Sequence, residues 1–536
     1  MRQLTARTLR SWAEHLGVDP ADLDPAGLRE RLARGTIPEI LERAARTHPA
    51  STLSVDDVRA TLAELHDSAC RGATVLAAHG LSPGDRVVIS ASSSLDLVTV
   101  YLAALRLGAT AVLINPAYTA DERAAILACA QANLLVTGSR NISRADGVRT
   151  LPLSDVIEQA RTAPLHPGAE TGQDSVALLA FTSGTTGSPK AVPLTHGQLL
   201  ASIRAAMWSW RWAPSDVLVH ALPLYHQHGL SGIHATLLGG SSAAILSRFS
   251  PEALIETVDR ERATVLFGVP SVHQRLLELP SRQLEPLRRL RLVTSGSAPL
   301  PVSLAQRFAG ATGVVLLERY GLTESGLNLS NRYSAERVPG LVGTPLPGVE
   351  AELADERGNP VPPGAEGEVV LRGPQIFDGY LDDPVATDAA FWPGGWFRTG
   401  DLGRFDQEGR IRITGRLKDL VITGGMNVSP AEVEAVIEQL PEVGEAAVAG
   451  IPSDRWGEEL SVWVVASGTG PIDAERIISH CRQHLAPYKC PKRVFQTTAL
   501  PRNPMGKLVR SRLVQETDVK DPSRPQGAAR TEYGAA

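Results

Sequence analysis

The regular alternation of short apolar runs with helical patterns constrains the fold of this chain more than any other feature of its sequence. Strand-length apolar runs stand at residues 87–90, 111–115 and 134–137, and helical patterns fill the gaps at residues 95–107 and 120–132. The same rhythm returns between residues 217 and 318, where the expected strands include residues 243–246 and 314–318. Strands that alternate with helices indicate βαβ units and largely parallel sheets, with sites at the carboxyl ends of the strands. We therefore predict an α/β fold.

Changes in the texture of the sequence predict the domain boundaries. Residues 1–36 carry leucines and a tryptophan at roughly helical spacing, which predicts a helical extension. Short alternating runs separated by Gly and Pro predict a mainly β subdomain over residues 345–415, within a first domain of residues 1–415. Residues 416–517 show an α+β pattern of about a hundred residues, a normal size for a small domain. Residues 518–536 are rich in Pro, Gly, Ala and Arg, and we expect them to be disordered.

Composition excludes several classes of protein. A chain of 536 residues is too long for one hydrophobic core, and its net charge of −5 argues against a nucleic-acid or anionic-membrane surface. The 4 cysteines show no C-x-x-C spacing, which suits a reduced cytosol and argues against structural zinc. The N-terminus has no apolar core of a signal peptide, and the most apolar window, residues 97–114, is interrupted by Arg106 and Gly108. We predict a soluble, cytoplasmic protein.

A loop rich in glycine and hydroxyl groups follows the apolar run at residues 176–180. Residues 181–192 read F-T-S-G-T-T-G-S-P-K-A-V. Glycines let several backbone N–H groups approach one phosphate, and Lys190 adds a cation. The loop is not a Walker A motif, because Pro189 replaces the glycine before the lysine and Ala191 replaces the hydroxyl residue after it. An ordinary Ser/Thr/Gly turn remains the alternative.

Other predicted strands are also followed by segments with candidate binding or catalytic side chains. His226 and His228 fit a metal pair or, better, a substrate pocket, since no third ligand of suitable spacing stands out. Glu324 fits a Mg²⁺ ligand or a solvated capping carboxylate. Asp401 could accept two ribose hydroxyls or be a turn residue, and Lys507 lies on a loop shaped by Gly and Pro where it could also be an ordinary surface lysine.

Taken in order, these motifs resemble the adenylate-forming superfamily, which contains acyl-CoA synthetases, luciferases and peptide-synthetase adenylation domains. The resemblance covers residues 37–513. It implies a large N-terminal domain of two α/β sheets plus a β-barrel-like subdomain. It also implies a small α+β C-terminal domain that rotates about a hinge at Lys418.

The resemblance assigns roles to residues that match the family's motifs. It assigns ATP or AMP to Thr182, Ser183, Gly184, Thr185, Thr186, Lys190, Ser297, Ala298, Glu318, Arg319, Tyr320, Gly321, Thr323, Asp401 and Arg416. It assigns the acyl substrate to His226, His228, Arg275, Ser295, Gly296, Gly326 and Leu327, and coenzyme A to Gly424, Gly425 and Met426. Catalysis falls to Lys507, His226, Glu324 and Thr182, of which Glu324 and Thr182 also face Mg²⁺.

The implied reaction has two steps. A carboxylate attacks the α-phosphorus of ATP and displaces pyrophosphate, while Lys507 and Mg²⁺ offset the charge on the crowded oxygens. The acyl-adenylate then meets the thiol of coenzyme A. The alternatives are an enzyme that loads a carrier-protein thiol and one that retains only one half-reaction. The context of Lys507 also resembles a site that lysine acetyltransferases modify in acyl-CoA synthetases, where acetylation would remove the charge.

Two remaining alternatives fit the sequence less well. A luciferase-like oxygenase would need an apolar pocket, which His226, His228 and Arg275 oppose. A nucleotide-binding regulator without activity would have lost Lys507 or Glu324, and both are present.

Within the superfamily, the middle of the chain resembles malonyl-CoA and oxalyl-CoA synthetases. Arg275 matches the arginine that pairs with a distal carboxylate in the malonyl-CoA enzymes. Leu327 replaces their usual Met, and Gly326 adds space beside it, which admits a bulkier acid. Ala191 and Met426 also depart from the common pattern, at the phosphate loop and the thiol tunnel. The sequence thus favours a malonate-like dicarboxylate or a bulkier specialised acid.

Overall fold

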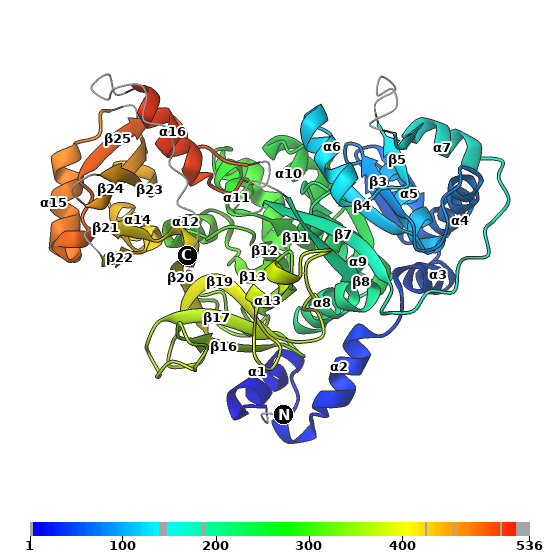
Figure 1. The fold of residues 1–536 in the computed structure, drawn as a ribbon, viewed down its shortest axis with the longest axis horizontal. Helices are drawn as coiled ribbons and strands as arrows, with labels where there is room; N and C mark the ends of the chain where they lie inside the picture. Colours follow the sequence, from blue (N-terminus) through cyan, green and yellow to red (C-terminus); the bar gives the residue numbers. More distant parts are fainter. Residues whose placement is uncertain are drawn as a thin grey trace. The chain divides into compact units, whose positions relative to one another are not determined.

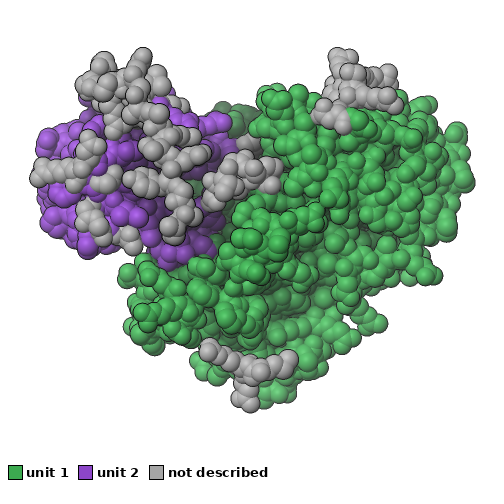
Figure 2. Space-filling model, viewed as in Figure 1, with its two compact units in different colours: residues 1–399, 403–413 green, residues 400–402, 414–536 purple. Residues whose placement is uncertain are grey.

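The computed structural model of the chain describes residues 4–138, 147–183, 189–423, 426–453, 456–468, 470–503 and 506–520. These residues divide into two compact units, coloured separately in Figure 2. Unit 1 holds residues up to 399 and residues 403–413, and unit 2 holds residues 400–402 and everything from Thr414 onward. Each unit has its own hydrophobic core.

A nine-stranded sheet is the largest element of unit 1 (Figure 1). Its strand order is β15-β14-β13-β12-β11-β9-β10-β1-β2. The six strands from β13 to β1 run parallel, whereas β14, β15 and β2 pair antiparallel with their neighbours. The strands are β1 (Thr52–Val55), β2 (Val58–Thr61), β9 (Val217–His220), β10 (Ser242–Ile245), β11 (Val265–Gly268), β12 (Leu292–Ser295), β13 (Leu317–Leu322), β14 (Gly326–Ser330) and β15 (Thr344–Pro345).

A second sheet of six strands has the order β6-β5-β3-β4-β7-β8. Its strands are β3 (Arg86–Ser90), β4 (Thr110–Ile114), β5 (Leu134–Thr137), β6 (Arg149–Pro152), β7 (Val176–Ser183) and β8 (Pro189–Thr195). Alternate residues of β3 enter different cores: Val88 packs with Ile126 of the helix α6, and Val87 joins the main core. Both faces are therefore covered, which explains why the strands read as continuous apolar runs.

Helices connect these strands as the alternating pattern predicts. They are α3 (Ile37–Thr47), α4 (Leu62–Ala78), α5 (Leu95–Arg106), α6 (Ala120–Cys129), α7 (Leu153–Ala160), α8 (His196–Ser209), α9 (Gln227–Gly239), α10 (Pro251–Arg260), α11 (Pro270–Leu276) and α12 (Val302–Thr312), with a 3-10 segment η2 (Ser281–Arg289). Several begin at a threonine whose side chain caps the first turn, as Thr195 does for α8. In the part of the chain that the structure describes, no helix is both long and apolar enough to cross a membrane.

The predicted β subdomain is a sheet of five strands, in which β16 pairs antiparallel with β17 and β18 with β19. It contains β16 (Glu350–Ala354), β17 (Gly367–Arg372), β18 (Phe391–Trp392), β19 (Trp396–Phe405) and β20 (Ile411–Arg416), together with α13 (Pro384–Ala389). The fold of unit 1 is thus two α/β sheets and a β subdomain, as the resemblance implies.

Unit 2 is an α+β unit around a second five-stranded sheet. Its elements are η3 (Leu417–Asp419), β21 (Val421–Thr423), β22 (Met426–Val428), α14 (Pro430–Ile437), β23 (Val443–Ser453), β24 (Gly457–Ala466), α15 (Ala474–His484), η4 (Pro487–Lys489), β25 (Arg493–Thr497) and α16 (Arg510–Lys520). The last helix continues to Lys520, three residues into the segment that we expected to be disordered. Residues 521–536 lie outside the described part of the chain.

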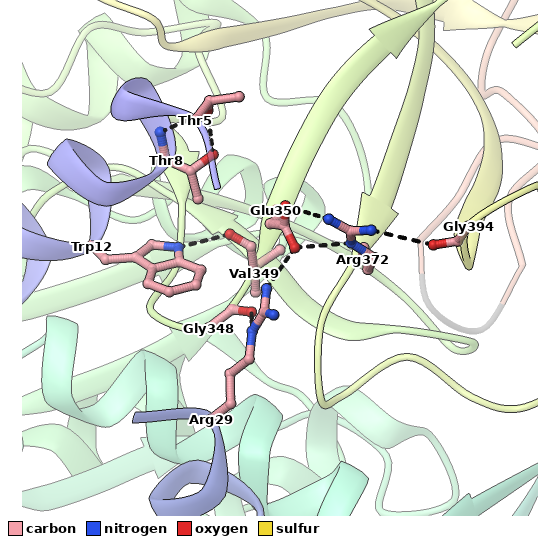
Figure 3. Close-up of polar contacts among 9 residues, drawn as sticks. All are labelled: Thr5, Thr8, Trp12, Arg29, Gly348, Val349, Glu350, Arg372 and Gly394. Carbon is pink, nitrogen blue, oxygen red and sulfur yellow. Dashed lines mark hydrogen bonds and ion pairs between the residues drawn. The ribbon is translucent and has the colours of Figure 1, made fainter. Parts of the chain in front are cut away.

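The N-terminal residues form the helices α1 (Ala6–Leu16) and α2 (Pro25–Ala33), joined by the 3-10 turn η1 (Pro20–Asp22). Thr5 caps the start of α1, and Gly17 ends it in the left-handed conformation. The indole of Trp12 is fully buried, and its Nε1–H donates to the carbonyl of Val349 over 2.7 Å (Figure 3). Arg29 of α2 donates to Gly348 and to the carboxylate of Glu350. The extension is therefore fastened to the start of the β subdomain.

Candidate active site

Four adjacent parallel strands bring their carboxyl ends together at one edge of the nine-stranded sheet. The register pairs His220 of β9 with Phe267 of β11, Gly268 with Ser295 of β12, and Ser295 with Glu318 of β13. The predicted segments that follow β9, β12 and β13 therefore start side by side. This is the edge at which open α/β sheets bind ligands.

His226 and His228 stand over this edge at the start of α9, where His226 is the N-cap residue. The Nδ1 atom of His228 lies 3.0 Å from the hydroxyl of Ser297. Burial lowers the pKa of His226 to about 4 and moves that of His228 well below its ordinary value, so both rings are neutral at pH 7. The buried Nε2 atoms of both rings have no hydrogen-bond partner among the described residues. No cluster of three or more metal-ligating side chains occurs in the described ranges.

The guanidinium of Arg319 is buried in the same place. A Cβ atom on Gly296 would lie 2.6 Å from Cζ of Arg319, so the side chain passes directly over that glycine. Burial lowers the pKa of Arg319 to about 9, and its charge helps to lower the pKa of His228. The group is still a cation at pH 7, and the described residues offer it no ion-pair partner. A buried cation without a counter-ion is costly, so Arg319 is a candidate for binding an anionic ligand.

The backbone around the pocket is held in unusual conformations. Ser297 has a φ of 67°, although it is not a glycine. Gly326 has a φ of 58°, and a Cβ atom there would meet the Ser202 hydroxyl at 2.3 Å. That hydroxyl accepts from the N–H of Leu327 over 2.8 Å. Glycine at residue 326 thus fits a tight turn against α8, so it does more than add space.

Arg275 lies on α11, the helix that follows β11. It is exposed on α11, and its Cζ atom stands 4.8 Å above the centre of the Phe249 ring. Its charge also helps to lower the pKa of Glu252, although the carboxylate's hydrogen bonds lower it more. In the structure Arg275 stacks on the Phe249 ring. Its pairing with the distal carboxylate of a substrate stays a prediction.

Lys190 and Glu324 meet through Tyr380, a residue that the sequence analysis did not select. The Nζ atom of Lys190 lies 4.8 Å from the centre of the Tyr380 ring, and the Tyr380 hydroxyl donates to Oε1 of Glu324 over 3.2 Å. The Phe377 N–H donates to the Glu324 carbonyl, which fixes the same turn. A phosphate-loop lysine and a candidate metal ligand therefore share one small cluster. Thr182 is paired with Lys190 in the β7–β8 ladder.

The other described residues of unit 1 that the resemblance assigns to ATP or AMP lie in β13 or follow β12 and β13. Ala298 follows Ser297 after β12, and a bulge between Tyr320 and Gly321 turns β13 towards Thr323. Glu318 is buried and accepts from the N–H of Gly340 over 2.7 Å. Gly184, Thr185 and Thr186 lie outside the described residues, as does the side chain of Ser183.

In unit 2, Asp401 and Arg416 form an ion pair. Nε of Arg416 donates to Oδ1 of Asp401, and Nη2 donates to Oδ2 over 3.4 Å. The carboxylate is buried, so this is a charge-assisted contact at low exposure. Both residues had been assigned to the ribose, and the structure brings them together.

Lys507 occupies a tight turn of unit 2. Its N–H donates to Oδ1 of Asn503 over 2.9 Å, and its carbonyl accepts from the Asn503 N–H over 2.8 Å. Burial, and after it the charge of Arg416, lower the pKa of Lys507 to about 8. Lys418 is exposed within η3, and Met426 is exposed on β22. Gly424 and Gly425 lie outside the described residues.

Comparison with known proteins agrees with this geometry. The family model of the AMP-binding enzymes matches residues 41–381, and the model of their C-terminal domain matches residues 432–507. The chain belongs to the AMP-binding enzyme family.

Relatives of this AMP-binding enzyme are CoA ligases. It is 34% identical to the oxalate–CoA ligase of Arabidopsis thaliana over 512 residues, which cover 90% of this chain and 98% of that one. It is also 34% identical to the mitochondrial malonate–CoA ligase of Mus musculus over 505 residues, covering 85% and 86% of the two chains. The ATP-bound structure of MatB from Rhodopseudomonas palustris is 36% identical, with a TM-score of 0.85 over 91% of this chain and 100% of that one. The protein is accordingly an adenylate-forming acid–thiol ligase.

Tyr380 is the functional candidate that sequence reasoning missed in this AMP-binding enzyme. It stands in the segment D-G-Y-L after β17, where no strand end or hydroxyl cluster drew attention to it. The only available signal was an aromatic residue between a glycine and an acidic pair, and such patterns are common in loops.

Proposed function

We propose that this ligase activates a dicarboxylic acid and that Arg319 binds the carboxylate that does not react. The buried, unpaired guanidinium of Arg319 supports this proposal more than any other observation. A carboxylate in the pocket would supply the missing counter-ion, and a planar guanidinium can bind it with two parallel hydrogen bonds. The free energy lost by burying the cation would then be recovered only with the correct substrate.

Other groups of the pocket fit a small polar acid. The Nε2 atoms of His226 and His228 and the hydroxyl of Ser295 are buried without partners among the described residues. An apolar acyl chain would leave these groups unsatisfied, which disfavours such a substrate. The relatives that act on oxalate and malonate are consistent with this class, whereas the feruloyl-CoA synthase of Amycolatopsis, at 34% identity, shows that similar chains accept bulkier acids.

The first step would take place at the cluster of Lys190, Tyr380 and Glu324. The ATP-bound relative supports ATP as the nucleotide. Glu324 fits Mg²⁺, because Tyr380 engages one of its oxygens and the second has no partner among the described residues. Mg²⁺ on phosphates commonly takes one or two protein carboxylates, and it would neutralise charge on the phosphate oxygens. Lys507 would stabilise the charge that develops as the acid's carboxylate displaces pyrophosphate.

The thiol that receives the acyl group is coenzyme A in this proposal, as in the named relatives. A carrier-protein thiol is the second candidate. Ile422 and Met426 are 54% and 47% exposed on the hairpin of β21 and β22, and an exposed apolar pair can dock a protein. Acetylation of Lys507 would switch the first step off by removing its charge.

A pyrophosphate-release screen tests the substrate. Diacids and monoacids of equal length are compared with the wild type, Arg319→Met and, as a matched control, Arg275→Met. We expect the wild type to prefer a diacid and Arg319→Met to lose about thirtyfold or more in kcat/KM for it, because removing one partner of a desolvated ion pair is costly. Monoacids should be affected far less.

The same screen separates the alternatives. A loss of diacid preference in Arg275→Met alone would assign the distal carboxylate to Arg275. A wild type that prefers bulky monoacids would refute the dicarboxylate proposal. Assays with coenzyme A, with a carrier protein and without a thiol identify the acceptor. Pyrophosphate release that persists with excess EDTA would exclude Mg²⁺.

A further inference from the structure

The N-terminal extension contacts an outermost strand of the nine-stranded sheet, the sheet that also carries the candidate pocket. Helix α1 lies outside the segment matched by the family model, which begins at residue 41. It contacts β15, the edge strand of the nine-stranded sheet. The hydroxyl of Ser11 donates to the carbonyl of Pro345 over 2.7 Å, and Nε2 of His15 lies 3.1 Å from the hydroxyl of Thr344. Trp12, which lies next to Ser11 in the sequence, donates to the carbonyl of Val349 (Figure 3).

Two rows of paired residues lead from these contacts into the site. In the first row, His15 meets Thr344, Thr344 pairs with Ser330, and Ser330 pairs with Arg319. In the second row, Ser11 meets Pro345, Pro345 pairs with Leu329, and Leu329 pairs with Tyr320. Helix α1 therefore lies at the outer end of both rows. The inner ends of the rows are Arg319 and Tyr320.

The contact between His15 and Thr344 fixes the outer end of the first row, beside the packing of the fully buried Trp12. A pocket of about 360 Å³ has Ser11 and Thr344 among its lining residues, and a smaller one of about 150 Å³ has Thr344 and Ser330 among its own. Ser11, His15, Thr344 and Ser330 are nevertheless all buried, so water does not easily replace their mutual contacts. Losing one such bond leaves a buried polar group unsatisfied and frees the edge strand.

The extension is also tied to the helix α8 through α2. Arg204 of α8 donates to the carbonyls of Arg31, Leu32 and Arg34 at the end of α2. The same helix α8 carries Ser202, which holds the backbone of Leu327. The extension thus joins α8 and β15, both of which contact β14.

We propose that α1 positions Arg319 and Tyr320 through β15 and β14, so that Ser11, His15 and Thr344 are positioning residues for substrate selection. The substrate part of this proposal rests on the proposed role of Arg319. The extension then acts on the discrimination between acids from the outer strands of the sheet.

Three variants of the full chain test this proposal. Ser11→Ala and Thr344→Val each remove one hydroxyl from a row with little change in volume. Arg7→Ala is the matched control, because Arg7 of the same helix pairs with Glu352 and stacks on Phe405 outside both rows. Each variant is measured by its melting temperature, by its ratio of kcat/KM for a diacid over a monoacid, and by amide hydrogen exchange of residues 317–330.

We expect Ser11→Ala and Thr344→Val to lower the diacid ratio about three- to tenfold and to speed exchange of residues 317–330, on the scale of one lost hydrogen bond. Arg7→Ala should leave both unchanged at a similar melting temperature. Unchanged exchange in the row variants, or an equal change in Arg7→Ala, would overturn the proposal. The wild type could instead show no preference for diacids, and the dicarboxylate proposal would then fail. Faster exchange of residues 317–330 in Ser11→Ala and Thr344→Val, but not in Arg7→Ala, would still support the positioning role of α1.

Discussion

Glu318 precedes the candidate substrate residue Arg319 and carries an unusual acid–base property. Its carboxyl group is buried, and this burial raises its pKa to about 8, against the opposing effects of the Gly340 N–H and the charge of Arg412. The folded protein therefore binds a proton at Glu318 between about pH 4.5 and pH 8 that the unfolded chain releases. Stability must fall as the pH rises through this window, and it should level off above it.

Glu318→Gln should remove this dependence. The amide oxygen can still accept from Gly340, but the side chain no longer ionises. We expect urea unfolding of the free protein to give a flatter dependence of stability on pH in the variant, with the variant gaining relative to the wild type as the pH approaches 8. An equally steep decline in both proteins would show that another group controls it.

The sequence predicts the surroundings of some site residues better than those of others. Glu324 and Lys190 were predicted because they stand in motifs after strands, and the structure brings them together on Tyr380. Arg319 was assigned to the nucleotide by resemblance, and its burial without a counter-ion could not be read from sequence. Arg275 matched a motif, yet its side chain is exposed against Phe249. Motifs thus indicate the strand end, whereas side-chain direction depends on packing that sequence does not show.

At the scale of elements, the parallel strands were predicted best. The runs expected at residues 134–137 and 243–246 correspond to β5 and β10 within one residue. The strand expected at residues 314–318 instead begins at Leu317 and continues to Leu322. Its polar residues Arg319 and Tyr320 pair with β14, so tertiary pairing overrides the apolar pattern. The loop expected at residues 181–192 similarly contains the paired ends of β7 and β8.

The short element η3 is where the proposed hinge can be tested. Proline at residue 418 fixes φ near −65° and disfavours the helical conformation of Leu417, the first residue of η3. We predict that Lys418→Pro still forms acyl-adenylate but loses thioester formation, as measured by separate assays of the two half-reactions. Lys418→Ala removes the charge alone and should retain both.

A proportional loss of both half-reactions in Lys418→Pro, with an unchanged melting curve, would contradict a hinge at this residue. A lowered melting temperature of Lys418→Pro would instead point to unfolding of unit 2. The melting temperature of Lys418→Ala shows how much of that decrease comes from losing the lysine side chain.

At the scale of the whole molecule, the division into two units matches a chemistry of two steps. Lys507 belongs to unit 2, whereas Glu324, Arg319 and the two histidines belong to unit 1. The resemblance led us to expect that Lys507 serves only the first step. This separation can be measured without knowing how the units move.

Lys507→Ala should therefore lower pyrophosphate release by about 10²-fold or more, the scale of losing one preorganised charge donor. The same variant should convert a supplied acyl-adenylate and thiol to thioester at a near-normal rate. Lys492→Ala, which removes an exposed lysine of the same unit, is the control. Normal pyrophosphate release by Lys507→Ala would refute the assignment.

The placement of α1 has a consequence beyond catalysis. An edge strand offers unpaired backbone groups to other chains, and long exposed edges promote aggregation. Here β15 has two residues, one of them a proline, and α1 uses the Pro345 carbonyl for its own hydrogen bond. The extension therefore covers the outer strand β15, at which a second molecule could otherwise add a strand.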